Sequence, residues 1–371
     1  MQIDAIDVFR LALPLHKPQK MAGREVDSLE TVLLRMRSGD AAGWAEAGVG
    51  NAPAAAGEWA GGVFACLKDW LVPAVVGTAI DSGDELAERL APFRGNRFAK
   101  AALDMAWWDL RARMREIPLH ELLGGERLAI EVGPTLDQME SIETFLEQVG
   151  RVLDDGFARV KLMMRPGWDV QMIDFVRKEF PVAALHVDVE GDMGLQHMDS
   201  LCRLDDFGLE MVEQPLPPDD LVGSAMVQDA LRTPVCLDEG VTTPEQADQA
   251  LDLKSCRFMN VHPGRVGGLT AAVAIGDACK RHDVRCFAGA MPQGSLGARF
   301  ELALAAKANF DYPADYYPAA ERLAEDVVEP LRPRRESPES SMQIALWSEP
   351  GIGVEPDAKL LERFCIEKAS L

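Results

Sequence analysis

The chain has 371 residues, of which 47% are hydrophobic and 26% are charged, and its net charge is −22. This composition is typical of a globular protein and excludes a disordered one. The length suits a (β/α) barrel of about 250 residues with an added domain. The strong negative charge repels nucleic acid phosphates and anionic membrane surfaces, so neither is expected as a partner.

The first residues and the cysteines predict a cytoplasmic protein. The start, MQIDAIDVFRLALPL, lacks the basic head, apolar stretch and cleavage site of a signal peptide. No segment approaches 18 uninterrupted apolar residues, so no transmembrane helix is expected. The seven cysteines form no CxxC pair, and several stand in apolar runs, which indicates reduced and buried thiols.

Residues 1–125 are predicted to form a small α+β domain. Its strand-like segments are 3–13 and 29–36, and its predicted helices are 55–71, 83–93 and 98–115. The polar segment 17–27 is too long for a simple hairpin. We interpret it either as a disordered surface loop or as a lid over a neighbouring site.

From residue 128 the chain alternates between strands and helices. The predicted strands are 129–136, 158–163, 183–188, 209–213, 235–238, 257–262 and 284–289. The predicted helices are 141–155, 169–179, 198–204, 222–231, a helix capped by Thr243 with Pro244 at its first position, and 269–282. Such alternation gives parallel βαβ units, and seven strands without a reversal favour a closed barrel over an open sheet.

Three carboxylates end successive strands of this predicted barrel. Asp188, Glu213 and Asp238 close the segments LHVD, MVE and VCLD, about one βα unit apart. A single acidic residue there is usually the N-cap of the next helix, but three on adjacent strands crowd one rim and repel each other unless a cation binds. Hard oxygen ligands suit Mg²⁺, with Mn²⁺ as an alternative.

Two basic residues end other strands of the same barrel. Lys161 lies in RVKLMMRPGWD and His262 in FMNVHPGRVGG. A basic group on each side of a metal site is suited to removing a proton next to a metal-bound carboxylate. The alternatives are a hydrogen-bonded structural role for His262 and a structural ion pair of Lys161 with Glu190.

An ordered set of motifs resembles one known family. The motifs are FRGNRFAKAALDMAWWDL, RVKLMMRPGWD, VEQPL, VCLDE, NVHPGRVGG and PGIGV. Together, and over nearly the whole chain, they resemble enolase-superfamily proteins of the muconate-lactonising type, in the o-succinylbenzoate synthase and N-succinylamino acid racemase group. The resemblance implies an α+β capping domain (1–125), a (β/α)7β TIM-like barrel (126–320) and a C-terminal segment (321–371) that returns to the cap. It also implies a homo-oligomer and Mg²⁺ ligation by Asp188, Glu213 and Asp238, in a site whose base is a lysine or histidine.

The chain departs from the family pattern at the acid/base positions. Met163 stands where the family's Lys-x-Lys motif has its second lysine, and His262 replaces the lysine of N-x-K-P-G-R. Glu190 replaces an asparagine, and Gln293 replaces a frequent glutamate. The expected substrate-contacting residues are Met163, Met21, Arg24, Glu190 and Gln293. Tyr316 and Tyr317 replace small hydroxyl residues and either line a changed pocket or pack on the surface.

These departures limit the chemistry that is expected. Because side chains alternate along a strand, Lys161 and Met163 point to the same inward face, and methionine carries no proton. Racemisation needs a proton carrier on each face of the substrate, so an efficient two-base racemase is not expected. Lys161 would hold the substrate carboxylate, or act as base in a different pose. The first hypothesis is a Mg²⁺-dependent lyase, cycloisomerase or isomerase that uses His262 to remove the proton α to a carboxylate. The second is a non-catalytic binding protein that retains the fold and the metal site.

Overall fold

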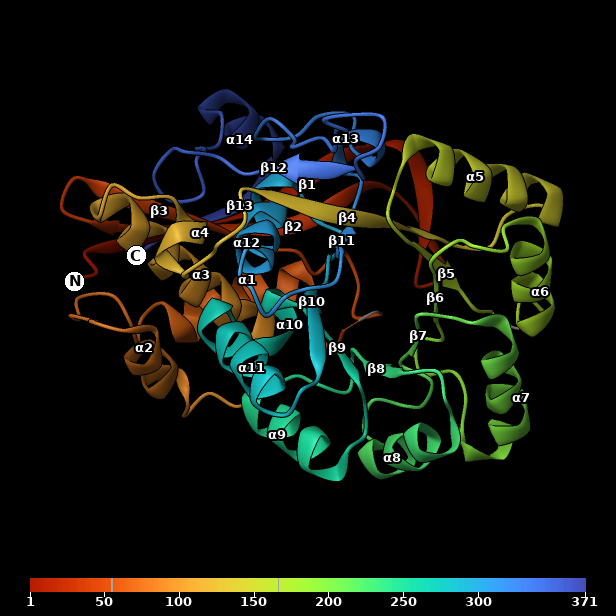
Figure 1. The fold of residues 1–371 in the computed structure, drawn as a ribbon. Helices are drawn as coiled ribbons and strands as arrows, with labels where there is room; N and C mark the ends of the chain where they lie inside the picture. Colours follow the sequence, from red (N-terminus) through yellow and green to blue (C-terminus); the bar gives the residue numbers. More distant parts are fainter. Residues whose placement is uncertain (55, 166) are drawn as a thin grey trace.

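The computed structural model describes residues 1–54, 56–165 and 167–371. A four-stranded antiparallel sheet with the order β13-β1-β2-β3 forms the base of the cap (Figure 1). Its strands are β1 (Ala5–Met21), β2 (Arg24–Ser38), β3 (Ala41–Ala47) and β13 (Cys365–Ser370). The cap helices are α1 (Ala60–Cys66), a π-helical turn (Leu67–Leu71), α2 (Gly83–Leu90), α3 (Arg97–Met114) and α4 (Leu119–Leu122). Helix α3 packs on β3 and β2 and is buried along most of its length, so it anchors the cap.

The expectation of a disordered loop at residues 17–27 is wrong, because β1 and β2 continue into it as a paired ribbon, while a lid over a neighbouring site stays a prediction. Their ladder runs to Met21↔Arg24, and Ala22 (φ 48°) and Gly23 (φ 76°) make the turn. Positive φ at both turn residues matches the twist of a two-residue hairpin. The ribbon is largely exposed on both faces, so its sequence lacks the apolar alternation that marks a half-buried strand.

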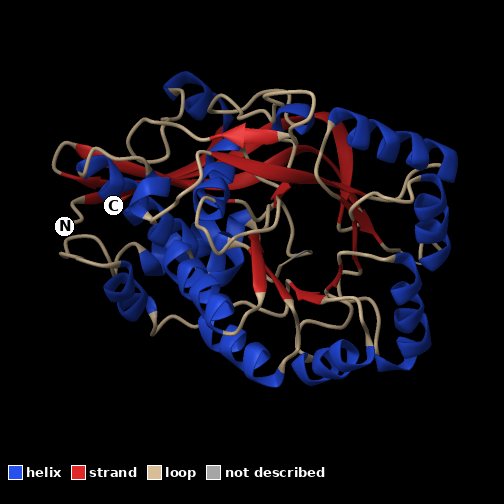
Figure 2. Cartoon of the chain, viewed as in Figure 1, coloured by secondary structure: helices blue, strands red, loops and turns tan. Residues whose placement is uncertain are grey.

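Eight parallel strands form a nearly closed barrel beside the cap (Figure 2). They are β4 (Ala129–Leu136), β5 (Val160–Met163), β6 (Leu185–Asp188), β7 (Met211–Glu213), β8 (Val235–Leu237), β9 (Phe258–Val261), β10 (Arg285–Ala288) and β11 (Ala314–Tyr316). Strand β11 pairs with β4 and lies beside β10, and β12 (Gln343–Ala345) adds to β4 in the antiparallel sense. The predicted (β/α)7β barrel with an N-terminal capping domain is therefore confirmed.

Helices cover the outside of the barrel. They are α5 (Ile142–Asp155), α6 (Val170–Glu179), α7 (Met198–Cys202), α8 (Leu221–Ala230), α9 (Pro244–Leu253), α11 (Leu269–Arg281) and α12 (Ser295–Ala305), with 3₁₀ turns at Leu195–His197 and Arg203–Phe207. Helix α10 (Pro263–Val266) contacts α3 of the cap, and α13 (Ala319–Arg322) and α14 (Ala358–Phe364) contact β1. Two predicted helix ends are confirmed: the Thr243 side chain accepts from the backbone N–H of Gln246 at 3.1 Å, and Gly156 ends α5 with φ 91°.

The side chains inside the barrel form two layers. Met211, Cys236, Phe258, Phe287 and Tyr312 make an apolar floor that is separate from the main core. Along β5, Val160 and Leu162 belong to the core between strands and helices, whereas Lys161 and Met163 alternate with them and face inward. The interior above the floor is polar, and this is where the carboxyl ends of the strands converge.

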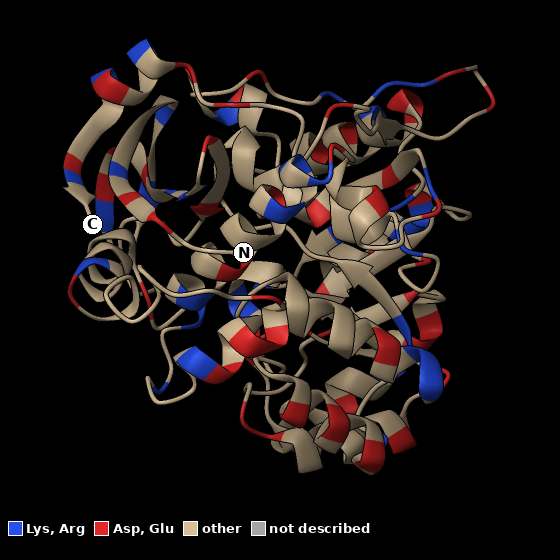
Figure 3. Ribbon diagram, turned by 90° about the vertical axis from the view of Figure 1, so that its left-hand side faces the viewer, with Lys and Arg blue, Asp and Glu red and all other residues tan. Residues whose placement is uncertain are grey.

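The surface carries the acidic excess of the chain. Asp and Glu number 60 against 38 Lys and Arg, and in Figure 3 they are spread over several helices and loops rather than gathered in one patch. Within the described residues, no helix is both long and apolar enough to span a bilayer.

Candidate active site

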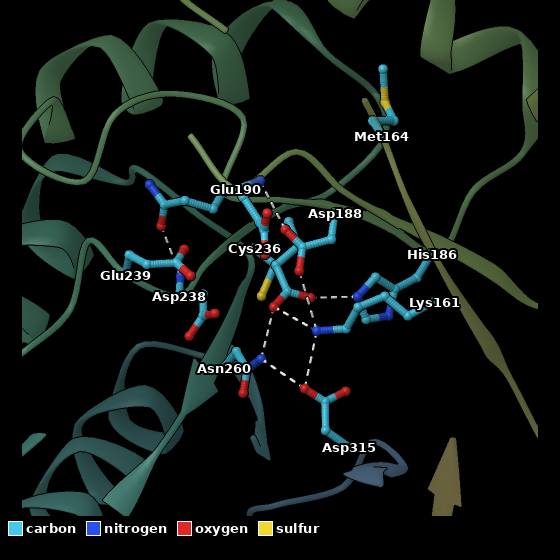
Figure 4. A network of polar contacts seen from close by, with 12 residues as sticks. Lys161, Met164, His186, Asp188, Glu190, Cys236, Asp238, Glu239, Asn260 and Asp315 are labelled. Atoms are coloured by element: carbon cyan, nitrogen blue, oxygen red, sulfur yellow. Dashed lines mark hydrogen bonds and ion pairs between the residues drawn. The ribbon is translucent and has the colours of Figure 1, made fainter. Parts of the chain in front are cut away.

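Three buried carboxylates lie at the carboxyl ends of adjacent barrel strands. Asp188 on β6 is the register partner of Glu213 on β7. Glu213 in turn pairs with Cys236 on β8, two residues before Asp238. Their side chains are at most 8% exposed. Figure 4 shows Asp188 and Asp238 in the same region of the interior. The fold thus brings together the three residues that the sequence singled out as metal ligands.

The ammonium of Lys161 lies among these carboxylates. Its Nζ donates to Glu213 Oε1 at 2.9 Å, to Asp315 Oδ2 at 3.0 Å and to Asp188 Oδ2 at 3.4 Å. Burial would lower the pKa of Lys161, but these carboxylates, Asp315 foremost, outweigh it and raise the pKa well above its usual value. Lys161 is therefore a fixed positive charge. The alternative of an ion pair with Glu190 is wrong, because Glu190 pairs with Arg165 instead.

Glu213 accepts hydrogen bonds from three side chains of the site. Besides Lys161, it accepts from Asn260 Nδ2 at 2.7 Å and from the ring of His186. Burial lowers the pKa of His186 to about 4, so this ring is neutral at pH 7 and donates through Nε2. Burial alone would raise the pKa of Glu213, but Lys161 and His186 hold it well below its usual range. Glu213 is consequently ionised.

Gln214 connects the ends of β7 and β8. It has a positive φ of 37°, and its Oε1 accepts from the backbone N–H groups of Asp238 and Gly240, both at 3.0 Å. Its amide nitrogen donates to the carbonyl of Leu216 at 2.7 Å. The glutamine of the VEQPL motif therefore holds the backbone at Asp238 and Gly240 in place.

Asp238 lies between a guanidinium and an imidazole. It pairs with Arg265, and its Oδ1 is 3.0 Å from Nε2 of His262. Burial raises the pKa of Asp238, but Arg265 and then His262 outweigh it and keep the pKa below its usual value. The next residue, Glu239, has its pKa raised to about 8 by burial and then by the charge of Asp238.

The site has more acidic than cationic side chains. Its acids are Asp188, Glu213, Asp238, Glu239 and Asp315, and its cations are Lys161, Arg265 and Arg159. The acids outnumber the cations by two, and two of the acids, Asp188 and Glu239, have raised pKa values because of burial and then of neighbouring carboxylates. The chemistry of the donors fits a hard divalent cation. In the described part of the chain no three His, Cys, Asp or Glu side chains converge closely enough to hold one. Lys161 and Arg265 are bonded to oxygens of Glu213 and Asp238.

His262 follows β9 and is only 3% exposed. Neither ring nitrogen makes a hydrogen bond with any residue that the structure describes, although Asp238 is close. Gly289 directly follows β10, and the ring of His262 occupies the space that a side chain at this position would fill. Nδ1 therefore has no partner among the described residues, whereas Nε2 lies against the Asp238 carboxylate.

Met163 lies on β5 next to Asp188, its register partner on β6. It is 5% exposed but belongs to neither apolar cluster, as expected for an inward-facing side chain. Strands β5 and β9 are four places apart in a ring of eight. Met163 and His262 therefore lie on opposite sides of the barrel.

The remaining residues expected to contact substrate are spread around the rim. Glu190 has a positive φ of 51°, and its backbone N–H donates to Asp188 Oδ1 at 3.0 Å. Gln293 is buried and donates to Glu301 at 2.6 Å. Met21 and Arg24, at the tip of the β1–β2 ribbon, line a cavity of about 500 Å³ together with Trp59.

Tyr316 and Tyr317 are half-buried rather than simply exposed. Tyr316 stacks on Phe157 with ring centroids 6.5 Å apart, and the guanidinium of Arg322 lies 5.8 Å from the ring of Tyr317. Both line a small cavity together with Asp315, at the carboxyl end of β11.

Seven polar residues of the site were missed from the sequence: Arg159, His186, Gln214, Glu239, Asn260, Arg265 and Asp315. Side-chain alternation could have found three of them, since Arg159, His186 and Asn260 each precede a predicted site residue by two positions. Asp315 gave no such signal, because the three-residue strand that carries it was not predicted.

Comparison with known proteins assigns both parts of the chain to one superfamily. Residues 5–124 match the family described as mandelate racemase / muconate lactonizing enzyme, N-terminal domain, and residues 144–360 match the enolase C-terminal domain-like family. The o-succinylbenzoate synthase of Bacillus subtilis is 31% identical over 98% of this chain and 97% of its own. An N-succinylamino acid racemase of Thermus thermophilus is 36% identical over 89% of each chain. The crystal structure of an enolase-superfamily protein from Listeria innocua superposes with a TM-score of 0.93 at 29% identity, over 100% of this chain and 99% of that one.

Proposed function

The chain belongs to the mandelate racemase / muconate lactonizing enzyme branch of the enolase superfamily, and on that basis we propose that it is a metal-dependent enzyme that removes the proton α to the carboxylate of a small acid. The observation that carries the proposal is the imidazole of His262, which is buried at the barrel rim, has Nε2 beside Asp238 and has no partner for Nδ1 among the described residues. A base in this state can accept a substrate proton without first breaking a hydrogen bond.

Asp188, Glu213 and Asp238 would hold Mg²⁺, or Mn²⁺, through their carboxylate oxygens. When bound, the ion stabilises the negative charge that develops on the substrate carboxylate as the α-proton leaves. The described residues of the site include two more acids than cations, and the raised pKa values of Asp188 and Glu239 indicate that these carboxylates lack a compensating positive charge, which supports such a cation. Lys161 contributes a fixed positive charge that orients the substrate carboxylate.

Only one side of the site carries an obvious proton carrier. His262 ends β9, whereas the facing position on β5 is Met163, and the neighbouring Lys161 is bound by three carboxylates. We therefore propose a one-base reaction: an elimination, a cyclisation or an isomerisation on a single face. The named relatives suggest succinyl-bearing carboxylic acids as the first substrates to test.

The test is exchange of the α-proton of N-succinylamino acids in D₂O with Mg²⁺, followed by NMR. The wild-type protein should exchange one enantiomer. His262→Ala should lose about 10² to 10⁴-fold, the contribution of a positioned base, while His282→Ala, at an exposed histidine, should be unchanged. Equal exchange of both enantiomers, or an unaffected His262→Ala, would overturn the proposed mechanism.

The second candidate function is a binding protein that keeps the barrel without turnover. The absence of a proton on Met163 and the complete pairing of Lys161 favour it. Such a protein would be stabilised by Mg²⁺ with a succinylated acid, yet show no α-exchange in the same samples.

A further inference from the structure

Lys161 is shared between two proposed metal ligands and one acid that lies outside the ligand set. Asp188 and Glu213 lie on β6 and β7, to one side of β5, whereas Asp315 lies on β11, to the other side beyond β4. Nζ is 2.9 Å from Glu213, 3.0 Å from Asp315 and 3.4 Å from Asp188. The ammonium is thus held between the ligands and Asp315.

Asn260 is shared in the same way. Its Nδ2 donates to Glu213 Oε1 at 2.7 Å and to Asp315 Oδ2 at 3.2 Å (Figure 4). Each of these two donors therefore has one partner among the proposed ligands and one on β11.

Asp315 is itself held in place from the barrel floor. Its other oxygen, Oδ1, accepts from Arg159 at 2.6 Å, and the same guanidinium nitrogen donates to the carbonyl of Pro313 at 3.1 Å. Arg159 is 1% exposed and its guanidinium lies 5.7 Å from the ring of Phe287. Asp315 is therefore a rigid acceptor, with its second oxygen directed at Lys161 and Asn260.

A buried ammonium bonded to Asp188 and Glu213 repels any cation that approaches the same oxygens. The ammonium cannot simply be released, because a buried charge without a partner is strongly unfavourable. Asp315 provides a partner that is not a proposed ligand.

We propose that Asp315 is a positioning residue, which holds Lys161 and Asn260 on the β11 side of the barrel so that Asp188 and Glu213 can bind a divalent cation. This inference rests on the metal site of the proposed function. It adds a residue, and a strand of the barrel, on which metal affinity depends without direct ligation.

The test is calorimetric titration of the full chain with Mn²⁺ alone, in a double-mutant cycle. Asp315→Asn keeps the side-chain shape and should weaken Mn²⁺ binding by about tenfold, a size typical of residues in one ion-pair network. In the Lys161→Met background, where no ammonium competes, the same substitution should change affinity by less than about twofold. Asp315→Glu keeps the charge and should retain most of the affinity, and circular dichroism checks the fold of each variant.

Two outcomes would overturn the inference while leaving the metal site intact. One is an equal loss in both backgrounds, which would mean that Asp315 acts only through its charge. The other is an unchanged affinity in well-folded Asp315→Asn. A wild-type protein that binds no Mn²⁺ would instead contradict the proposed metal site and, with it, this role of Asp315.

Discussion

Gly289 leaves the space that the imidazole of His262 fills. A methyl group on its α-carbon would lie 2.3 Å from Nε2 of His262 and 2.3 Å from Oδ1 of Asn260, closer than real side-chain contacts. The end of β10 therefore accommodates the imidazole only because residue 289 is a glycine.

Gly289→Ala should displace the imidazole and lower the rate of α-exchange. We expect a loss approaching that of His262→Ala, together with an overpacking cost of about 1–3 kcal/mol in the free energy of unfolding. Gly150→Ala on α5 is the control, because its added methyl meets only ordinary contacts at 3.5 Å. An undiminished exchange rate in folded Gly289→Ala would show that the ring position is not used in the reaction.

Met163→Lys should supply a proton carrier on the second face. The position faces inward on β5, opposite His262, so a new ammonium there can reach the other face of a substrate held between them. We expect exchange of both enantiomers of an N-succinylamino acid, measured by NMR and polarimetry. Met164→Lys is the matched control, since Met164 packs in the outer core and should only destabilise the fold. Exchange still confined to one enantiomer in Met163→Lys would contradict the assigned geometry.

Mg²⁺ should stabilise the wild-type protein against unfolding, by about 2.7 kcal/mol at one hundred times its Kd. The Asp188→Asn variant should not gain stability from Mg²⁺. In the absence of Mg²⁺ it should be as stable as the wild-type protein, because burial and then Glu213 disfavour the charged form of Asp188 and raise its pKa. The measurement is thermal unfolding with Mg²⁺ or with EDTA. Asp174→Asn, on the exposed face of α6, should keep the wild-type response. A full Mg²⁺ response in Asp188→Asn would remove Asp188 from the ligand set.

Glu46 of the cap should make stability depend on pH. It accepts from the backbone N–H groups of Gly294 and Gly297 at the start of α12, at 2.7 and 2.8 Å. Burial, and then Asp326, raise its pKa from 4.5 to about 7. Between these values the folded protein holds a proton that the unfolded chain has released, so this contribution to stability falls as the pH rises through the window.

Glu46→Gln removes that titration. Its free energy of unfolding relative to wild type should rise between pH 4.5 and pH 7, by about 3 kcal/mol at most, and level off above. Urea unfolding at several pH values measures it, with Glu336→Gln at an exposed site as a pH-independent control. A difference that stays constant across the window would place the pKa of Glu46 near its ordinary value.

Much of the barrel could be predicted from the sequence because its signals are local. The cap at Thr243, the glycine at 156 and the acids that end β6, β7 and β8 each follow from the residues around them. The β1–β2 ribbon was missed because pairing, not burial, stabilises it. Asp315 was missed for a related reason: its importance comes from Lys161, which is 154 residues away in the sequence.

The pairing of β13 with β1 has a consequence for the order of folding. Asp7 faces Ser370 in this ladder, so almost the entire chain separates two neighbouring strands (Figure 1). During synthesis the outer edge of β1 stays open until β13 has left the ribosome, and an open edge can pair with other chains. The barrel has all its strands before the cap sheet is finished, and a chain that lacked β13 would carry a permanently exposed edge.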